Sequence, residues 1–326
     1  MRLGIMLLAV LGITFDAGAA PVKRYFFGNA ADVSPKLHGP ALDLGGGGGN
    51  HEPALQWVID HIRGCTDCDA KVDVVVLRAS DYNDYNEMIG ALAGVDSVET
   101  LVFTERTSSF DPALISLISR AELVFFAGGD QCNYVRIFNG TPIEKAIREV
   151  YGRGGAVGGS SAGLAIQGEY VYDACNDASA RSVNALRDPF NDEISFTRDF
   201  FDWKVMKGTF TDTHFSRRDR MGRLMVFLAR QLHETGATEA LGIGVDEGTS
   251  LVVGRDGVGT VVGDGSVYLV LADHPAEVMR PGEPLTYCDF RIWRIPPGGT
   301  VSLMDRPVSG YYTVSVNHGV MDRNPY

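Results

Sequence analysis

Short, continuous apolar runs alternate along this chain with segments whose apolar residues recur at helical spacing. The runs at residues 72–77 and 123–127 are rich in β-branched and aromatic residues, which is typical of buried strands, and residues 98–103 are predicted to form a further strand. Between them, residues 85–92 and 112–119 have the pattern of amphipathic helices. Strands and helices in this order predict a parallel sheet that helices cover on both sides.

Two further expected strands end in glycine-rich turns. The apolar run 41–44 stops at five glycines, residues 45–49, and a helical pattern follows. The strand at 156–157 turns sharply at residues 158–163, and the strand at 123–127 runs into two glycines of its own. Ligands bind at the carboxyl ends of the strands in such a sheet, so these three turns are expected to surround the site.

The second half of the chain has a different pattern. Residues 174–202 lack steady periodicity and are interpreted as a long insertion, whereas residues 221–232 form a helical pattern. Residues 241–317 combine valine-rich runs with glycine turns, which predicts antiparallel strands that extend the sheet. We find no repeat, linker or boundary. The prediction is one α/β domain over residues 21–326, with three αβα layers, a mostly parallel central sheet and a C-terminal antiparallel β extension.

The first twenty residues have the pattern of a signal peptide. Arg2 precedes an uncharged run, residues 3–15, that is too short to cross a bilayer comfortably. Small residues at 17–20 and then Pro21 fit a cleavage site. A buried first strand or helix is the alternative. We expect an exported protein, secreted or periplasmic, with no membrane segment once the signal peptide is removed.

Charge and composition exclude several classes of protein. With 29 basic and 41 acidic residues the net charge is −12, so nucleic-acid binding is not expected. Neither a phosphate-binding loop nor a dinucleotide-binding pattern fits the glycine turns, and no cofactor is expected. No zinc-binding pattern occurs, so no metal is expected. The five cysteines are an odd number, and Cys65 and Cys68 are interpreted as a local disulfide or two surface thiols.

The third glycine turn contains a candidate nucleophile. Its sequence, Gly159-Ser160-Ser161-Ala162-Gly163, has the form G-x-S-x-G. Between a buried strand and a helix, this pattern predicts a strained turn, a nucleophile elbow, that exposes the hydroxyl of Ser161. The backbone N–H of Ala162, at the start of that helix, is the expected donor to an oxyanion.

A serine nucleophile needs a base, and His214 is the candidate among seven histidines. It stands at the entry to a helix, in a run that contains four arginines within an otherwise acidic chain. Arginines bind carboxylates through two parallel hydrogen bonds, so this run predicts a site for a substrate with free carboxylates. The acid that orients His214 is expected at Asp246-Glu247, after the run 241–245. The rival acids are Asp173, Glu169 and Asp212.

Together these motifs resemble the cyanophycinase family of serine peptidases, which are similar in fold to class I glutamine amidotransferases but have serine at the elbow. The matching motifs are Gly128-Gly129-Asp130-Gln131, the elbow at 159–163, Asp212-x-His214-Phe215-x-x-x-Arg218-x-Arg220-x-Gly222-Arg223-Leu224, and Gly244-Val245-Asp246-Glu247-x-Thr249. The resemblance spans about residues 40 to 270. It suggests a homodimer.

The resemblance implies a role for each matching position. Ser161 would be the nucleophile, His214 the general base and Glu247 the orienting acid. The residues that would hold the substrate are Gln131, Asp212, Arg218, Arg220 and Arg223. The implied substrate is cyanophycin, a polyaspartate with arginine joined to each β-carboxyl, and the implied products are β-aspartyl-arginine dipeptides. One departure is Thr213, because the family usually has glutamine at this position, where it contacts the substrate.

Two other classes of function fit part of the pattern. An α/β-hydrolase esterase also has a G-x-S-x-G elbow, and its order of residues would make His274 or His318 the base. The esterase hypothesis does not explain the run of arginines. In a non-catalytic exported binding protein, which is the other alternative, the elbow would have only a structural role.

Overall fold

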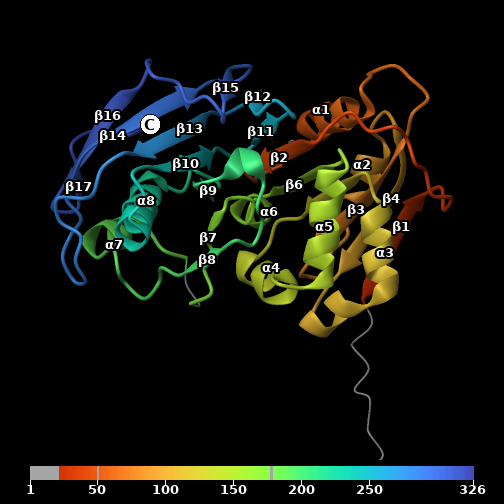
Figure 1. Cartoon of the computed structure of the whole chain (residues 1–326), viewed down its shortest axis with the longest axis horizontal. Coiled ribbons are helices and arrows are strands. Elements are labelled where there is room, and N and C mark those ends of the chain that lie inside the picture. Colours follow the sequence, from red (N-terminus) through yellow and green to blue (C-terminus); the bar gives the residue numbers. More distant parts are fainter. Residues whose placement is uncertain (1–21, 50, 177–178) are drawn as a thin grey trace, which may run out of the picture.

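The structure of the chain is a computed structural model that describes residues 22–49, 51–176 and 179–326 (Figure 1). The predicted signal peptide therefore lies outside the described residues. Within these three ranges the strands form one nine-stranded and one eight-stranded sheet. In the same ranges, no helix combines the length and the apolar character that crossing a membrane requires.

The nine-stranded sheet contains the predicted parallel strands. In spatial order its strands are β1 (Lys23–Gly28), β4 (Val95–Val102), β3 (Val72–Arg78), β5 (Leu123–Phe126), β6 (Ala156–Ser160), β2 (Ala41–Gly45), β11 (Thr249–Val253), β12 (Val258–Gly263) and β15 (Thr300–Ser302). The strands from β4 to β2 are parallel to one another, and those on either side are antiparallel. The edge strand β1 has no counterpart among the predicted elements.

The second half of the chain contains the predicted antiparallel strands, but only some of them extend the nine-stranded sheet, and the others belong to the eight-stranded sheet. In spatial order its strands are β17 (Val320–Met321), β16 (Tyr312–Asn317), β14 (Tyr287–Ile295), β13 (Val267–Ala272), β10 (Ala240–Val245), β9 (Thr209–Asp212), β7 (Tyr170–Tyr172) and β8 (Phe196–Arg198). Residues 241–317 thus divide between two sheets and do not simply extend one. An alternating pattern identifies a strand but leaves its partner to tertiary packing.

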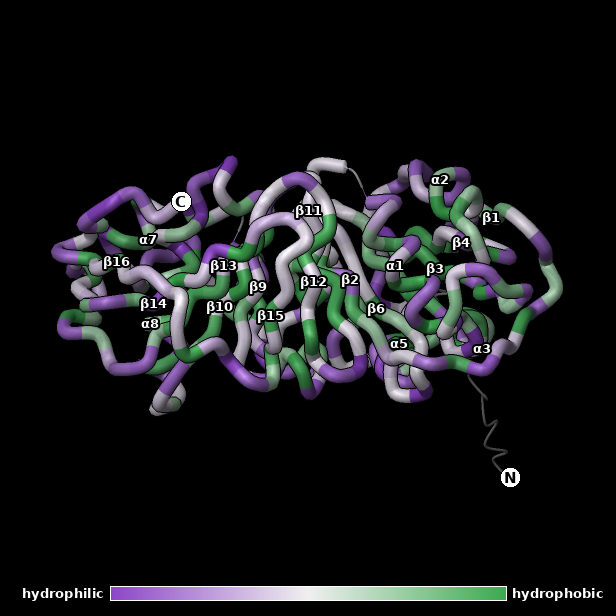
Figure 2. Tube along the Cα trace, turned by 90° about the horizontal axis from the view of Figure 1, so that it is seen from above, coloured by the Kyte–Doolittle hydropathy of each residue, from purple (hydrophilic) through white to green (hydrophobic). Residues whose placement is uncertain are grey.

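Helices cover both faces of the nine-stranded sheet, as the alternating pattern predicted. Their bounds are α1 (Glu52–Arg63), α2 (Asn86–Gly90), α3 (Pro112–Arg120), α4 (Gln131–Phe138), α5 (Pro142–Gly152), α6 (Ala162–Ala165), α7 (Ser182–Arg187) and α8 (Met221–Thr235), with short 3-10 helices at Arg106–Phe110 and Lys204–Met206. The view in Figure 2 shows α1 and α5 on opposite sides of β6. Apolar residues of α1 and of α5 belong to two separate core clusters. Both α7 and α8 pack with the eight-stranded sheet.

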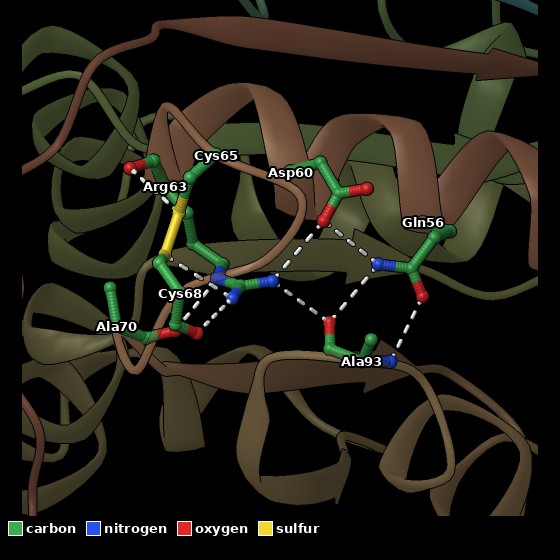
Figure 3. Close-up of a disulfide and its surroundings, with 7 residues drawn as sticks. All are labelled: Gln56, Asp60, Arg63, Cys65, Cys68, Ala70 and Ala93. Carbon is green, nitrogen blue, oxygen red and sulfur yellow. Dashed lines mark hydrogen bonds and ion pairs between the residues drawn. A yellow bond between two sulfur atoms is a disulfide. The ribbon is translucent and has the colours of Figure 1, made fainter.

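A disulfide joins Cys65 and Cys68 just after α1, which agrees with the prediction of a local disulfide. The guanidinium of Arg63, the last residue of α1, is buried beside it (Figure 3). It donates hydrogen bonds to the carbonyl oxygens of Cys68 and Ala70 and to the carboxylate of Asp60. The disulfide therefore closes a short turn in the surface loop after α1, and Arg63 ties that loop to the end of the helix. Neither cysteine lines the cavity at Ser161.

The glycine turns meet where the two sheets adjoin. The N–H of His214, after β9, donates to the carbonyl oxygen of Gly46, after β2. The N–H of Gly248, between β10 and β11, donates to the carbonyl oxygen of Gly47. The N–H of Ser161, after β6, donates to the carbonyl oxygen of Gly45. These backbone bonds bring the carboxyl ends of β2, β6, β9 and β10 to one place.

Candidate active site

Ser161 lies in the turn between β6 and α6, as the strand–turn–helix pattern predicted. Its φ of 54° is in the left-handed region, which is strained for a residue with a side chain. A Cβ on Gly159 would lie 2.6 Å from the carbonyl carbon of Gly163, and one on Gly163 would lie 2.2 Å from the carbonyl oxygen of Phe126. Glycine is therefore required at both positions, and the turn presents the Ser161 side chain to a cavity.

Ser161, His214 and Glu247 form a chain of side-chain hydrogen bonds. The Ser161 Oγ lies 2.8 Å from His214 Nε2, and His214 Nδ1 lies 2.6 Å from Glu247 Oε1. A carboxylate can only accept, so the imidazole proton is on Nδ1 and Nε2 is left to accept from the serine hydroxyl. This arrangement can remove the proton from the hydroxyl as the oxygen attacks a carbonyl group.

The five-glycine turn makes room for this histidine and this acid. A Cβ on Gly47 would lie 2.5 Å from Cε1 of the His214 ring, and one on Gly48 would lie 2.9 Å from Cβ of Glu247. Both glycines also have positive φ, 93° and 84°. The sequence pattern showed that the turn is unusual, but it did not show that the histidine ring packs against it.

The rival acids have partners elsewhere. Glu169 accepts from the N–H of Gly208. Asp173 accepts from the hydroxyls of Ser195 and Thr197 and from the N–H of Cys175. The carboxylate of Asp246 accepts from the N–H groups of Ser216 and Ser266. Glu247 is thus the one of these candidate acids that contacts the His214 ring.

The two histidines of the esterase alternative also lie elsewhere. The ring nitrogens of His274 lie 2.9 Å from the carbonyl oxygens of Pro275 and Cys288, and the ring stacks on Tyr287. His318 Nδ1 lies 2.7 Å from the side-chain oxygen of Asn317. Neither histidine lines the cavity at Ser161.

Burial and nearby charges favour a neutral His214 and an ionised Glu247. Burial lowers the pKa of His214 below 6.5, the charges of Arg218 and Arg220 lower it further, and the hydrogen bond with Glu247 opposes them. Burial would raise the pKa of Glu247, but the contact with His214 and the charges of Arg217 and Arg218 lower it overall. At neutral pH the imidazole can therefore accept a proton.

The cavity beside Ser161 has a volume of about 420 Å³ and brings the predicted substrate residues together. Its lining includes all of them, namely Gln131, Asp212, Arg218, Arg220 and Arg223, and also Ala162 and Thr213. The Gln131 Nε2 donates to the carbonyl oxygen of Tyr172 at 3.3 Å. Arg218 is half-exposed and lies 4.0 Å from the carboxylate of Glu247.

Two of the predicted substrate residues bind each other. Arg223 and Asp212 form a buried pair, with Arg223 Nε 2.7 Å from Asp212 Oδ2 and Nη2 bonded to Oδ1. Arg223 also donates to Ser179 and Ala180. Because each of the two charges is bound to the other, the pair supports the cavity wall. The arginine spacing alone could not separate this role from direct substrate binding.

Arg220 and Thr213 lie next to this pair. Arg220 Nη1 donates to the Thr213 carbonyl oxygen at 2.9 Å and to its hydroxyl at 2.8 Å. Burial lowers the pKa of Arg220 to about 10, so its guanidinium remains charged at neutral pH. Thr213, where the family usually has glutamine, is buried and serves as the acceptor that holds Arg220.

Several residues of the cavity wall were not predicted from the sequence, among them Arg136, Cys132 and Cys175. Arg136 lines the cavity from α4, and Cys132 and Cys175 line it as a disulfide that joins α4 to the segment after β7. The spacing of 43 residues between the two cysteines gave no signal of their pairing. Within the described ranges, no group of three or more His, Cys, Asp or Glu side chains is arranged to hold a metal ion.

Comparison with known proteins shows which family the chain belongs to. Residues 44–261 match the model of peptidase family S51. The cyanophycinase of Trichormus variabilis is 30% identical over 225 residues, which cover 66% of this chain and 68% of that protein. The cyanophycinase of Synechococcus elongatus is 26% identical over 225 residues, covering 66% of this chain and 63% of that protein.

A solved structure supports the fold alone. A peptidase from an acI-B1 Actinobacterium superposes with a TM-score of 0.55 at 19% identity, covering 82% of this chain and 98% of that one. The predicted α/β fold, similar to class I glutamine amidotransferases and with added antiparallel strands, is confirmed. Since the family model matches about two thirds of the chain, this protein belongs to peptidase family S51 and is a serine peptidase.

Proposed function

We propose that this peptidase hydrolyses cyanophycin, or a β-aspartyl peptide of the same chemistry, and releases β-aspartyl-arginine dipeptides through an acyl-enzyme on Ser161. The observation that carries the proposal is the hydrogen-bonded chain Ser161–His214–Glu247 at the wall of an arginine-lined cavity. The name cyanophycinase, borne by the relatives, supports the choice of substrate.

In the first step, Ser161 Oγ attacks the carbonyl carbon of the scissile peptide bond. The hydroxyl proton passes to His214 Nε2, 2.8 Å away, and the ionised Glu247 stabilises the imidazolium that forms. The backbone N–H of Ala162, beside Ser161, would donate to the oxyanion. When the C–N bond breaks, His214 returns the proton to the leaving amine, and Ser161 keeps the acyl group as an ester.

In the second step, water replaces the amine. His214 takes a proton from water as its oxygen attacks the ester carbon, and the C–O bond to Ser161 then breaks. The proton goes back to Ser161 Oγ, so the enzyme is regenerated and the product leaves with a carboxylate.

Charge in the cavity suits the proposed substrate. Arginine is joined to the polymer through its α-amino group, so each unit keeps a free α-carboxylate. Arg220 uses Nη1 for Thr213 and Asp212, which leaves the other nitrogens of its guanidinium for such a carboxylate. Arg218, half-exposed at the same wall, would be the second donor, and Gln131 would bind a polar group of the backbone.

We further propose that the protein acts after export, in the periplasm or outside the cell. The predicted signal peptide, residues 1–20, motivates this location. The disulfides Cys65–Cys68 and Cys132–Cys175 support it, because disulfides persist in oxidising compartments.

Labelling with a fluorophosphonate tests the nucleophile, and two substrates test the class of reaction. We expect the probe to modify Ser161 in the wild type and nothing in Ser161→Ala. The matched control is Ser160→Ala, because Ser160 is the adjacent serine and is buried against His51. We also expect hydrolysis of cyanophycin and little of p-nitrophenyl esters. Modification of another residue, or a preference for esters, would contradict the proposal.

A further inference from the structure

A cationic side chain that the proposed mechanism leaves unused lies in the same cavity as Ser161. Arg136 is on α4, five residues after Gln131, which is about 7.5 Å further along the helix axis. The residue is exposed and lines the cavity. Within the described residues its guanidinium has one hydrogen bond, and the acceptor is neutral: the carbonyl oxygen of Cys175, 3.3 Å from Nη2.

The Cys132–Cys175 disulfide fixes this contact at both ends. Cys132 lies four residues before Arg136, so both side chains are on the same face of α4. The disulfide joins that face to Cys175, whose carbonyl oxygen accepts from Arg136, and the two Cα atoms are 5.0 Å apart. The guanidinium is therefore held at the cavity wall before a ligand arrives, which lowers the entropy cost of binding.

Among the described residues, the other charged side chains near the cavity have partners other than Arg136. Asp212 is paired with Arg223, and Glu247 contacts His214 and Arg217. Asp130 caps the opposite end of α4, where its carboxylate accepts from the N–H of Cys132. It is six residues from Arg136, or about 9 Å along the axis. With respect to the part of the chain that the structure describes, Arg136 is thus a cation available to an anionic ligand.

We propose that Arg136 forms a second carboxylate subsite, which binds the arginine carboxylate of a polymer unit beyond the one that is cut. This subsite rests on the proposed function. An extended backbone advances 3.3–3.6 Å per residue, so the roughly 7.5 Å from Gln131 to Arg136 corresponds to about two aspartyl units. The subsite gives the enzyme a preference for longer oligomers over the shortest one that it can cut.

A double-mutant cycle between protein and substrate tests the contact. One substrate is a four-unit β-aspartyl-arginine oligomer, and the other is the same oligomer with the arginine carboxylates outside the cut unit converted to amides. The proteins are the wild type, Arg136→Gln and the control Arg106→Gln. Arg106 is a neighbouring exposed arginine that donates to the carbonyl oxygen of Arg136 and does not line the cavity.

We expect Arg136→Gln to lower kcat/KM about ten- to a hundredfold on the carboxylate oligomer and to have little effect on the amide oligomer. The control variant should behave like the wild type on both. An equal loss on the two substrates would mean that Arg136 only supports the fold, and no loss on either would mean that it binds nothing; each result overturns the subsite. If the wild type cuts neither oligomer, the proposed function itself fails.

Discussion

Replacing Glu247 with glutamine tests how His214 is held and charged. The amide keeps the size of the side chain but removes the negative charge 2.6 Å from His214 Nδ1. A hydrogen bond to a charged group contributes about 1.5–3 kcal/mol, and 1.36 kcal/mol corresponds to a factor of ten in rate. The Glu247 side chain is 24% exposed, and solvent screening places the effect toward the lower value. We therefore expect the rate of the chemical step to fall about ten- to a hundredfold.

The same substitution should change the pH dependence in a defined direction. Activity requires a neutral imidazole, so the acid limb of the profile follows the pKa of His214, which lies below 6.5 in the wild type. Glu247 raises this pKa, and its loss should move the limb to lower pH. Arg218 lowers the pKa, so Arg218→Gln should move the limb to higher pH.

The assay is the rate of fluorophosphonate labelling as a function of pH, because this small probe does not need the carboxylate site. Glu169→Gln is the control, since Glu169 binds the N–H of Gly208 away from the histidine. The reasoning is refuted if Glu247→Gln and Glu169→Gln give the same profile, or if the two charge changes at Glu247 and Arg218 move the limb in the same direction.

Three further predictions concern the parts that support the site. Arg223→Lys should lower the free energy of unfolding by about 3 kcal/mol, because the lysine cannot make the two bonds to the buried Asp212. Arg220→Lys should lower the free energy of unfolding by less. Equal urea midpoints for both variants and the wild type would contradict this prediction. Tyr326→Phe should lower the free energy of unfolding by about 1 kcal/mol and should also lower kcat/KM, because the Tyr326 hydroxyl bonds to the N–H of Met221 and to the carboxylate of Asp219, at the end of the loop from His214 to Arg220. The control is Tyr25→Phe, which removes an exposed hydroxyl bonded to Asp81. Effects of Tyr326→Phe no larger than those of the control would contradict this prediction. Burial raises the pKa of Asp43 from 3.8 to about 7, so above about pH 4 the folded protein holds a proton that the unfolded chain has released. The contribution of Asp43 to stability should therefore decrease as pH rises from about 4 to 7, by up to about 4 kcal/mol. Burial also raises the pKa of Glu122 to about 7, so Glu122 contributes a decrease in the same direction. In urea unfolding, Asp43→Asn should therefore reduce, without abolishing, the decrease in stability that these two groups cause between about pH 4 and 7. A pH dependence of stability equal to that of the wild type would contradict this prediction.

The sequence alone was sufficient to predict the strands that a local pattern of residues identifies. The predicted strands at 72–77, 98–103 and 123–127 are β3, β4 and β5, because β-branched and aromatic residues predominate in these runs even where Asp73 or Glu99 interrupts them. The elbow at Ser161 was also predictable, since its glycines have no steric alternative there. Strand β1 was missed, because it is an edge strand that exposes Phe26 and Phe27 and lacks the buried pattern.

Features that depend on contacts between distant segments could not be read from the sequence. The division of residues 241–317 between two sheets is set by which strands pair, and alternation does not encode the partner. The Asp212–Arg223 pair, the packing of His214 on Gly47 and the Cys132–Cys175 disulfide all require the folded chain. Short elements such as α7 and β8 contain too few residues for a period to be recognised within 174–202.

The most direct test of the central claim is mass spectrometry of the products released from cyanophycin. The purified wild type and Ser161→Ala are incubated with the polymer under the same conditions, after circular dichroism shows that both are folded. We predict that the wild type releases β-aspartyl-arginine dipeptide and that Ser161→Ala releases none. The absence of dipeptide from the folded wild type, or equal release by the two proteins, would contradict the assignment of Ser161 as the nucleophile of a cyanophycin-cleaving peptidase.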